Sequence, residues 1–452
     1  MRLVKAVLRN AWTLAIEALS WVELRGWSGR LALSQTTEQL KISDRTTIRI
    51  AHRLVKETLR RQNTIDRIIN LVLAPSSLHD FKLGIRAFLK LYTYWMLFLK
   101  GASPQHAPKI AALGRMILGW REMNKIESVL GRITTINTNK IFIGLSDEER
   151  ISLETFHPTW FVRYCFHLLG RDQALKFLRK SMEIPPTYIR INTLKGNEDD
   201  LVAKIRRTRI TLEQVTGLRH LYRVLDGETP PVKTKAYAEG SFFIQDPASC
   251  LCVEVADPQP KMTVLDICAA PGAKTTYLAQ IMKNQGCIYS IDYSPRRMVV
   301  LKGELSRMEV KIAHPIIADA CRTLPIEVKA NLVLLDPPCS STGAFWKTPS
   351  AKWRVDLRAV HGLAKLQWMM LNACADLVEN EGSLVYSTCS ITLEENEILI
   401  ERFLKWHPEF RLVDAKPRIG LPGLRGLFQC QRLYPHIHNT NGFFVAKLVR
   451  EK

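Results

Sequence analysis

The sequence lacks three features that would place it in a common class of protein. Its ten cysteines include no Cys-x-x-Cys pair, which argues against a zinc site of the usual spacing and against a disulfide scaffold. Its most apolar tract, residues 91–99, lies between Lys90 and Lys100 and is too short to cross a bilayer. It has neither a GxxxxGK[ST] phosphate loop nor a GxGxxG fingerprint. We therefore expect a cytoplasmic chain with no metal and no membrane association.

Acidic residues are scarce relative to basic ones. The chain has 64 Lys+Arg against 43 Asp+Glu, a net charge of +21 and a pI near 9.6. Residues 1–150 contain 24 of the basic and 12 of the acidic residues, so they carry more than half of the excess. Such a balance favours a polyanionic partner, with nucleic acid ahead of an acidic membrane surface. A basic protein with no such partner remains the alternative.

Residues 1–148 are predicted to be helical throughout. Ser43-Asp44 is a typical helix start, and the following apolar residues recur at helical spacing. The opposite face of that helix carries a row of cations: Arg45, Arg49, Arg53, Lys56, Arg60 and Arg61. A row of this kind is either a solvated face or a phosphate-binding surface. We expect Arg45, Arg49 and Arg53 to contact RNA phosphates.

The rest of the chain divides into two further regions. Residues 149–240 are predicted to be a small α+β module that contains an alternating strand, TYIRINTLK (187–195). From residue 241 onward, strands and helices alternate, which is typical of a parallel, doubly wound sheet. The chain is therefore expected to be multidomain, with an all-α first domain and an α/β last domain.

Acidic residues lie at the ends of four consecutive predicted strands of the last region, at Asp266, Asp292, Asp319 and Asp336. Between the first strand and its helix lies CAAPGAK (268–274), a turn that brings backbone N–H groups close to a ligand. A carboxylate at the end of the second strand, Asp292, is placed to accept hydrogen bonds from ribose hydroxyls. The four acids together predict a nucleoside-binding crevice.

Three motifs carry a resemblance to a known family. CAAPGAK (268–274), DPPC (336–339) and LVYSTCSITLEENE (384–397) resemble the Sun/Fmu family of S-adenosylmethionine-dependent RNA cytosine-C5 methyltransferases. IRINTLK (189–195), SFFIQDPAS (241–249) and TNGFFVAKL (440–448) also match it. The resemblance implies a NusB-like RNA-binding domain at 1–148, an RNA-recognition-like module at 149–240 and a Rossmann-like methyltransferase domain at 241–452.

The resemblance also implies a substrate and a cofactor site. The substrate is ribosomal RNA, with transfer RNA as the near alternative, and the product is 5-methylcytosine. A non-catalytic RNA-binding assembly factor is the third hypothesis. We expect a monomer. The residues implied for S-adenosylmethionine binding are Cys268, Ala269, Ala270, Pro271, Gly272, Ala273, Lys274, Asp292, Asp319 and Asp336. Ala273 stands where the family more often has glycine, and residues 347–350 also depart from its pattern.

Two cysteines, Cys339 and Cys389, lie within the motifs and are candidates for the chemical step. Cytosine C5 is a poor nucleophile until a thiolate adds at C6, so the reaction needs a cysteine. By analogy with DNA methyltransferases the Pro-Cys thiol, Cys339, would attack; the family resemblance instead assigns attack to Cys389 and product release to Cys339. Thr392-x-x-Glu395 resembles a capping box, so we expect a helix N-terminus that lowers the pKa of Cys389.

The remaining expected site residues contact RNA. Asp336 is expected to accept a hydrogen bond from the cytosine N4 amino group, which distinguishes cytosine from uracil. Lys347 and Lys352 are expected to contact phosphates. Trp353, together with Phe345 and Trp346, is expected to stack on bases, with packing under a loop as the alternative.

Overall fold

The computed structural model describes residues 2–322, 324 and 327–451, which form two compact units. The first contains residues 1–182 and 348–356; the second contains residues 183–347 and 357–452. This division differs from the expected boundary at residue 148. Residues 149–182, expected in the α+β module, form helices that belong to the first unit.

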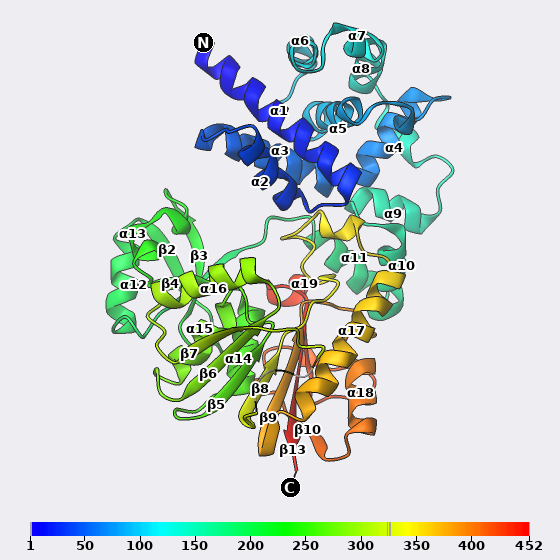
Figure 1. Cartoon of the computed structure of the whole chain (residues 1–452). Helices are drawn as coiled ribbons and strands as arrows, with labels where there is room; N and C mark the ends of the chain where they lie inside the picture. The colour runs from blue at the N-terminus through cyan, green and yellow to red at the C-terminus, as the bar shows by residue number, and fades with distance from the viewer. Residues whose placement is uncertain (1, 323, 325–326, 452) are drawn as a thin grey trace. The chain divides into compact units, whose positions relative to one another are not determined.

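The first unit is helical, as predicted (Figure 1). Helix α1 packs against α2, α3 and α5, and its Trp12 side chain lies against Phe88 and Trp95 in the core. In the part of the chain that the structure describes, no helix is both long and apolar enough to cross a membrane. The helices are α1 (Arg2–Arg25), α2 (Gly29–Gln39), α3 (Arg45–Arg60), α4 (Gln62–Leu73), α5 (Leu83–Phe98), α6 (Ala107–Leu118), α7 (Trp120–Asn124), α8 (Glu127–Thr134), α9 (Asp147–Thr155), α10 (Thr159–Leu169) and α11 (Arg171–Lys180).

Residues 348–356 lie far along the chain but belong to this helical unit. The Trp353 indole N–H donates to the carbonyl of Leu59, in the last turn of α3. The last carbonyls of a helix have no partner within the helix, so this bond satisfies one of them. The Lys352 ammonium donates to the carbonyl of Phe156, just past α9. The segment is therefore held by two backbone carbonyls of the first unit.

The second unit begins with a four-stranded antiparallel sheet in the order β2-β3-β1-β4. Ile189 and Ile191 of β1 point into its core, which confirms the alternation expected there. The other face is also buried: Arg190 donates to Thr276 Oγ1 at 2.9 Å and lies 4.4 Å from the Tyr277 ring. The elements are β1 (Thr187–Ile191), α12 (Glu198–Arg206), β2 (Ile210–Gln214), β3 (Leu221–Gly227), α13 (Lys235–Ala238) and β4 (Phe242–Ile244).

A nine-stranded sheet forms the rest of the second unit and confirms the Rossmann-like prediction. Strands β7-β6-β5-β8-β9 run parallel and β13 is antiparallel to β9. Helices α14 and α15 cover one face, and α17 and α18 cover the other (Figure 1). The strands are β5 (Thr263–Ile267), β6 (Cys287–Asp292), β7 (Ala313–Ile317), β8 (Ala330–Leu335), β9 (Val378–Thr388), β10 (Phe410–Val413), β11 (Leu421–Pro422), β12 (Gln431–Leu433) and β13 (Phe443–Arg450). The helices are α14 (Pro247–Ala256), α15 (Ala273–Ile281), α16 (Pro295–Arg307), α17 (Leu357–Ala375), α18 (Glu397–Trp406) and α19 (Pro435–His438).

Candidate active site

The CAAPGAK loop connects β5 to α15 at the carboxyl edge of the parallel strands. Gly272 has a φ of +107°, a conformation that favours glycine, and its carbonyl accepts the first helical hydrogen bond of α15, from Thr276 N. The Ala269 N–H donates to Ile291 O of the neighbouring β6 at 2.9 Å. The loop is thus fixed to two strands and a helix start, which is the geometry expected of a nucleoside-binding turn.

Asp292, at the end of β6, is buried against this loop. Its carboxylate accepts hydrogen bonds from Ala270 N at 3.2 Å and Ser294 N at 3.0 Å, and Arg297 Nη1 lies 3.1 Å away. None of the Asp292 side chain is exposed, whereas 43% of the Arg297 side chain is. The expected ribose contact stays a prediction. The expectation from sequence did not include Arg297, and its spacing from Asp292 gave no signal for it.

Asp266, inside β5, is the acid with the most perturbed environment. The Thr275 hydroxyl donates to its Oδ2 at 2.5 Å, while Oδ1 is buried and has no hydrogen-bond partner among the described residues. Burial raises the pKa of Asp266 to about 7. Asp319, by contrast, is exposed just past β7, where it accepts from Cys321 N. In the described parts of the chain, no group of three or more His, Cys, Asp or Glu is placed to hold a metal ion.

Asp336, directly after β8, is paired with a residue of the cofactor loop. Lys274 Nζ lies 2.6 Å from Asp336 Oδ2, and the Ser387 hydroxyl donates to Oδ1 at 2.9 Å. Burial opposes the charge on Lys274, but the attraction of Asp336 outweighs it and raises the pKa of that lysine. The Asp336 side chain is 30% exposed, so each oxygen can still accept a further hydrogen bond.

The two expected cysteines face each other beside Asp336. The Sγ atoms of Cys339 and Cys389 are 3.3 Å apart, and the Ser341 hydroxyl lies 3.4 Å from Cys389 Sγ. The hydrogen bond from Cys339, with help from Ser341, lowers the pKa of Cys389, although burial opposes this. The same bond, together with burial, raises the pKa of Cys339 well above its usual range. Cys389 is therefore the thiol that ionises first, and Cys339 is the one that keeps its proton.

Comparison with known proteins decides the family. Residues 253–449 match the family model described as 16S rRNA methyltransferase RsmB/F, and residues 9–108 match the NusB family. The chain belongs to the RsmB/F family of RNA cytosine-C5 methyltransferases and carries a NusB-like N-terminal domain. The resemblance to the Sun/Fmu family is thereby confirmed.

Three relatives show how far the similarity extends. A probable ribosomal RNA small subunit methyltransferase B of Bacillus subtilis is 28% identical over 96% of this chain and 97% of its own length. The 25S rRNA (cytosine-C(5))-methyltransferase nop2 of Schizosaccharomyces pombe is 34% identical over 63% of this chain and 49% of its length. The tRNA (cytosine(72)-C(5))-methyltransferase of Pyrococcus horikoshii is 34% identical over 48% and 54%. The chain thus spans about half of the second and third relatives, and nearly all of the first.

Two solved structures share the fold. The crystal structure of PH0851 superposes with a TM-score of 0.82 at 29% identity, covering 98% of this chain and 99% of that one. NSun6 from Pyrococcus horikoshii with SFG has a TM-score of 0.61 at 25% identity, covering 65% and 98%. The fold of PH0851 is therefore shared across nearly the whole chain, and that of NSun6 across about two thirds of it.

Several residues that were expected to contact RNA are instead buried within the protein. Lys352 is 2% exposed, Trp346 is 1% exposed and Phe345 is 2% exposed, so all three pack inside the protein. Trp353 is partly buried and bonded to Leu59, as described above. The phosphate contact expected of Lys352 is wrong for this arrangement, because its ammonium faces the Phe156 carbonyl. Lys347 is partly exposed and pairs with Asp246 at 2.5 Å.

The arginine row of α3 is divided in the same way. Arg45, Arg49 and Arg53 are exposed, as a phosphate-binding surface requires. Arg60 is buried, and the Arg61 guanidinium lies 5.2 Å from the Phe156 ring centroid and pairs with Glu57 at 2.6 Å. Only the first half of the row is therefore available to RNA.

The capping box expected at Thr392 and Glu395 is wrong. Helix α18 begins later, at Glu397, and Glu395 lies in the loop before it. Thr392 Oγ1 does donate to Glu395 Oε2 at 2.8 Å, but neither residue caps the helix. The reason is tertiary: the Glu395 carboxylate accepts hydrogen bonds from the Cys339 loop instead, including one from Ser340 N at 2.8 Å. The sequence pattern around Glu395 indicated only a capping box.

Proposed function

We propose that the chain transfers a methyl group from S-adenosylmethionine to C5 of a cytosine in ribosomal RNA, through a covalent adduct between Cys389 and cytosine C6. The observation that carries this proposal is the pair of thiols 3.3 Å apart with opposite pKa directions, next to Asp336. A single thiol would serve attack alone. A pair in which one proton is held by one member provides both a nucleophile and a second acid–base group.

The residues at the sheet edge fit the cofactor. Asp292 and Asp336 supply carboxylate acceptors, and the buried Asp266 Oδ1 lacks a partner among the described residues, as an acceptor for a cofactor donor would. The neighbour NSun6 was solved with SFG, an analogue of S-adenosylmethionine. When bound, S-adenosylmethionine would supply a methyl group from its sulfonium, whose sulfur keeps the carbon–sulfur electron pair and becomes a neutral thioether.

The protein's own groups carry the remaining steps. The Cys389 thiolate adds to C6, and the displaced electron pair makes C5 nucleophilic, while Asp336 accepts from N4 and holds the ring. Once Cys389 is bonded to carbon, its charge no longer holds the proton on Cys339. After C5 has taken the methyl group, Cys339 releases its proton to solvent and its thiolate takes the C5 proton, so that the C5–C6 double bond re-forms and the Cys389 thiolate is expelled. A base can react in this way only outside a duplex stack.

Ribosomal RNA is favoured over transfer RNA by the extent of the similarity. The Bacillus subtilis relative, which matches nearly the full chain, is described as a small-subunit ribosomal RNA methyltransferase. The transfer RNA enzyme matches about half of each chain. Transfer RNA is the second candidate on that ground. A non-catalytic assembly factor fits less well, because both thiols and the Lys274–Asp336 pair are in place.

Two alanine variants and a control test the proposal. Cys389→Ala should yield neither 5-methylcytosine nor an adduct, because C5 is never activated. Cys339→Ala should methylate and then stall as a protein–RNA adduct that survives a denaturing gel but not proteolysis. Cys321→Ala, a partly exposed thiol outside the pair, should behave as wild type. An adduct formed by Cys389→Ala and absent from Cys339→Ala would reverse the two roles. Mapping of tritium from labelled S-adenosylmethionine separates ribosomal from transfer RNA.

A further inference from the structure

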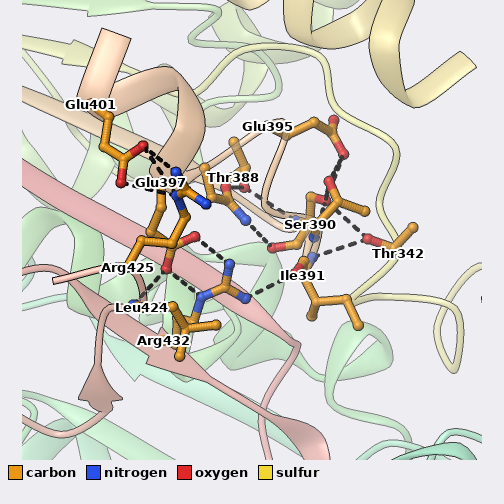
Figure 2. Close-up of polar contacts among 12 residues, drawn as sticks. Thr342, Thr388, Ser390, Ile391, Glu395, Glu397, Glu401, Leu424, Arg425 and Arg432 are labelled. Carbon is orange, nitrogen blue, oxygen red and sulfur yellow. Dashed lines mark hydrogen bonds and ion pairs between the residues drawn. The ribbon is translucent and has the colours of Figure 1, made fainter. Parts of the chain in front are cut away.

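Glu395 is a fully buried carboxylate in the loop between β9 and α18. Five hydrogen-bond donors converge on it from three segments of the second unit. Figure 2 shows Glu395 beside Ser390, which is one of them. Oε1 accepts from Ser340 N at 2.8 Å and from Gln367 Nε2 of α17 at 2.9 Å. Oε2 accepts from the hydroxyls of Ser340 at 2.5 Å, Ser390 at 2.6 Å and Thr392 at 2.8 Å. A carboxylate with this many donors is a strong constraint on all of them.

The donors flank both thiols. Ser340 directly follows Cys339, and Ser390 directly follows Cys389, so Glu395 connects the two cysteine loops through one residue on each side. Other contacts join the same loops: Gly343 N donates to Cys389 O at 3.0 Å, and Ile391 N donates to Thr342 Oγ1 at 3.0 Å. Glu395 is the only one of these groups that carries a charge, and it binds backbone and side chain of the Cys339 loop at once.

We infer that Glu395 is a positioning residue that sets how Cys339 faces Cys389 and thereby controls release of the covalent adduct. This inference rests on the proposed function. Glu395 does not touch the reacting atoms, so its effect passes through Ser340 and Ser390 to the two thiols. Loss of Glu395 should affect release more than attack. Attack needs only Cys389, whereas release needs Cys339 to be correctly placed beside Cys389.

The charged groups around the two thiols shift their pKa values in opposite directions. The negative charge of Glu395 contributes to the raised pKa of Cys339, after the Cys389 hydrogen bond and burial. On the cofactor side of the pair, Asp336 also raises the Cys339 pKa, and Lys274 helps to lower that of Cys389. Loss of Glu395 removes one cause of the raised pKa of Cys339, which alone would favour release. The slower release expected below therefore comes from the loosened Cys339 loop.

The structure offers a matched control two residues away. Glu397 is equally buried, but it pairs with Arg432, whose Nε lies 2.6 Å from Glu397 Oε1 (Figure 2). Arg432 also donates to Ile391 O at 2.8 Å. Glu397 thus supports the same loop from the other side without bonding either serine. Glu397→Gln should destabilise the fold to a similar degree and measures what loss of buried polar support alone does.

The experiment compares Glu395→Gln with Glu397→Gln on full-length protein. The glutamine keeps the size of the side chain and one acceptor oxygen, and Ser340→Ala with Ser390→Ala serves as an independent variant if Glu395→Gln folds poorly. We expect Glu395→Gln to bind S-adenosylhomocysteine as wild type does and to form adduct, but to release it about 10- to 100-fold more slowly. The readout is the ratio of denaturation-resistant adduct to free 5-methylcytosine RNA in single turnover. Glu397→Gln should leave that ratio unchanged.

Two outcomes would overturn the inference, and a third would overturn only its foundation. If Glu395→Gln and Glu397→Gln lower methylation in step with their melting temperatures and leave the adduct ratio alone, Glu395 is merely structural. If the serine double variant releases product as fast as wild type, the link through the loops is wrong. If wild type makes no 5-methylcytosine and Cys339→Ala traps no adduct, the proposed function itself fails.

Discussion

Two lysines, Lys274 in the second unit and Lys352 in the first, expose little of their side chains, yet their pKa values shift in opposite directions. Lys274, at the sheet edge of the second unit, lies 2.6 Å from the Asp336 carboxylate, and its pKa is raised. Lys352, on the segment that belongs to the helical unit, faces the carbonyl of Phe156 and the charges of Arg60 and Arg61. Burial, followed by those two arginines, pushes its pKa well below the usual range. The partner, and not the burial, decides whether a buried cation stays charged.

Lys274 and Lys352, two lysines in motif positions, therefore have different roles. Lys274 places a positive charge near Cys389, which helps to lower the pKa of that thiol, whereas its partner Asp336 raises it. Lys352 helps to bind a segment to its own unit. Exposed arginines such as Arg45 belong to a third class, available to a polyanion. The predictions below test these three classes, from the largest expected effect to the smallest.

The first prediction removes the paired lysine. Lys274→Met should lower kcat/KM by about 10- to 100-fold, because it removes a charge-assisted contact to Asp336 of about 1.5–3 kcal/mol. It leaves Asp336 uncompensated beside Cys389, so the thiolate is also disfavoured. Steady-state methylation on a folded variant is the measurement. Lys347→Met is the control, since Lys347 also pairs with a carboxylate but is 34% exposed. Equal losses in the two variants would remove the special role of Lys274.

The second prediction removes the proton donor of the thiol pair. Cys339→Ala should raise the pKa of Cys389, because the largest cause of its lowering is the hydrogen bond from Cys339. The thiolate then forms only at higher pH, so alkylation of Cys389 at neutral pH should slow by about tenfold, the effect of one pKa unit. Iodoacetamide labelling against pH, with the site read by mass spectrometry, measures it without RNA. An unchanged or lowered midpoint would show that Cys339 does not stabilise the thiolate.

The third prediction concerns the exposed arginines. Replacing Arg45, Arg49 and Arg53 together by glutamine should weaken RNA binding most at low salt. If each arginine contacts a phosphate of unpaired RNA, the slope of log affinity against log salt should become shallower by about 2. Cofactor affinity should not change. A slope equal to that of wild type would mean that this face of α3 is only solvated.

The fourth prediction has the smallest effect. Lys352→Met should leave RNA affinity and its salt slope unchanged, because the lysine is inside the unit. Its folded pKa lies below the unfolded value, so the burial penalty is present at neutral pH and is lost as pH rises toward the unfolded pKa. The variant should therefore be equally or more stable at neutral pH, by about 1–4 kcal/mol at most. Denaturant titration at two pH values measures this, and a weakened RNA complex would show that Lys352 reaches the RNA after all.

The sequence was sufficient for features that depend on residue type and chain order. The ends of the predicted strands identified the acidic residues, and the motifs identified Cys339 and Cys389. The structure brings the two cysteines together. The sequence was not sufficient where a side chain chooses between distant partners. The Trp353 indole bonds to Leu59, 294 residues away, and Glu395 bonds to Ser340, 55 residues away, although each had a plausible local or RNA-facing interpretation. Periodicity identifies which face of an element is polar, but not what covers it, as the buried Arg190 shows.

The excursion of residues 348–356 makes the two units inseparable as pieces of polypeptide. The chain passes between them three times, near residues 182, 347 and 356, so neither unit is one continuous stretch. After a single proteolytic cut between α11 and β1, residues 348–356 would still belong to the first unit while being covalently joined to the second. A truncation that begins at residue 149 would likewise remove the Leu59 carbonyl to which Trp353 donates, fourteen residues after Cys339. Any replacement of the helical unit must therefore also provide a partner for residues 348–356, which follow Cys339 in the second unit's chain.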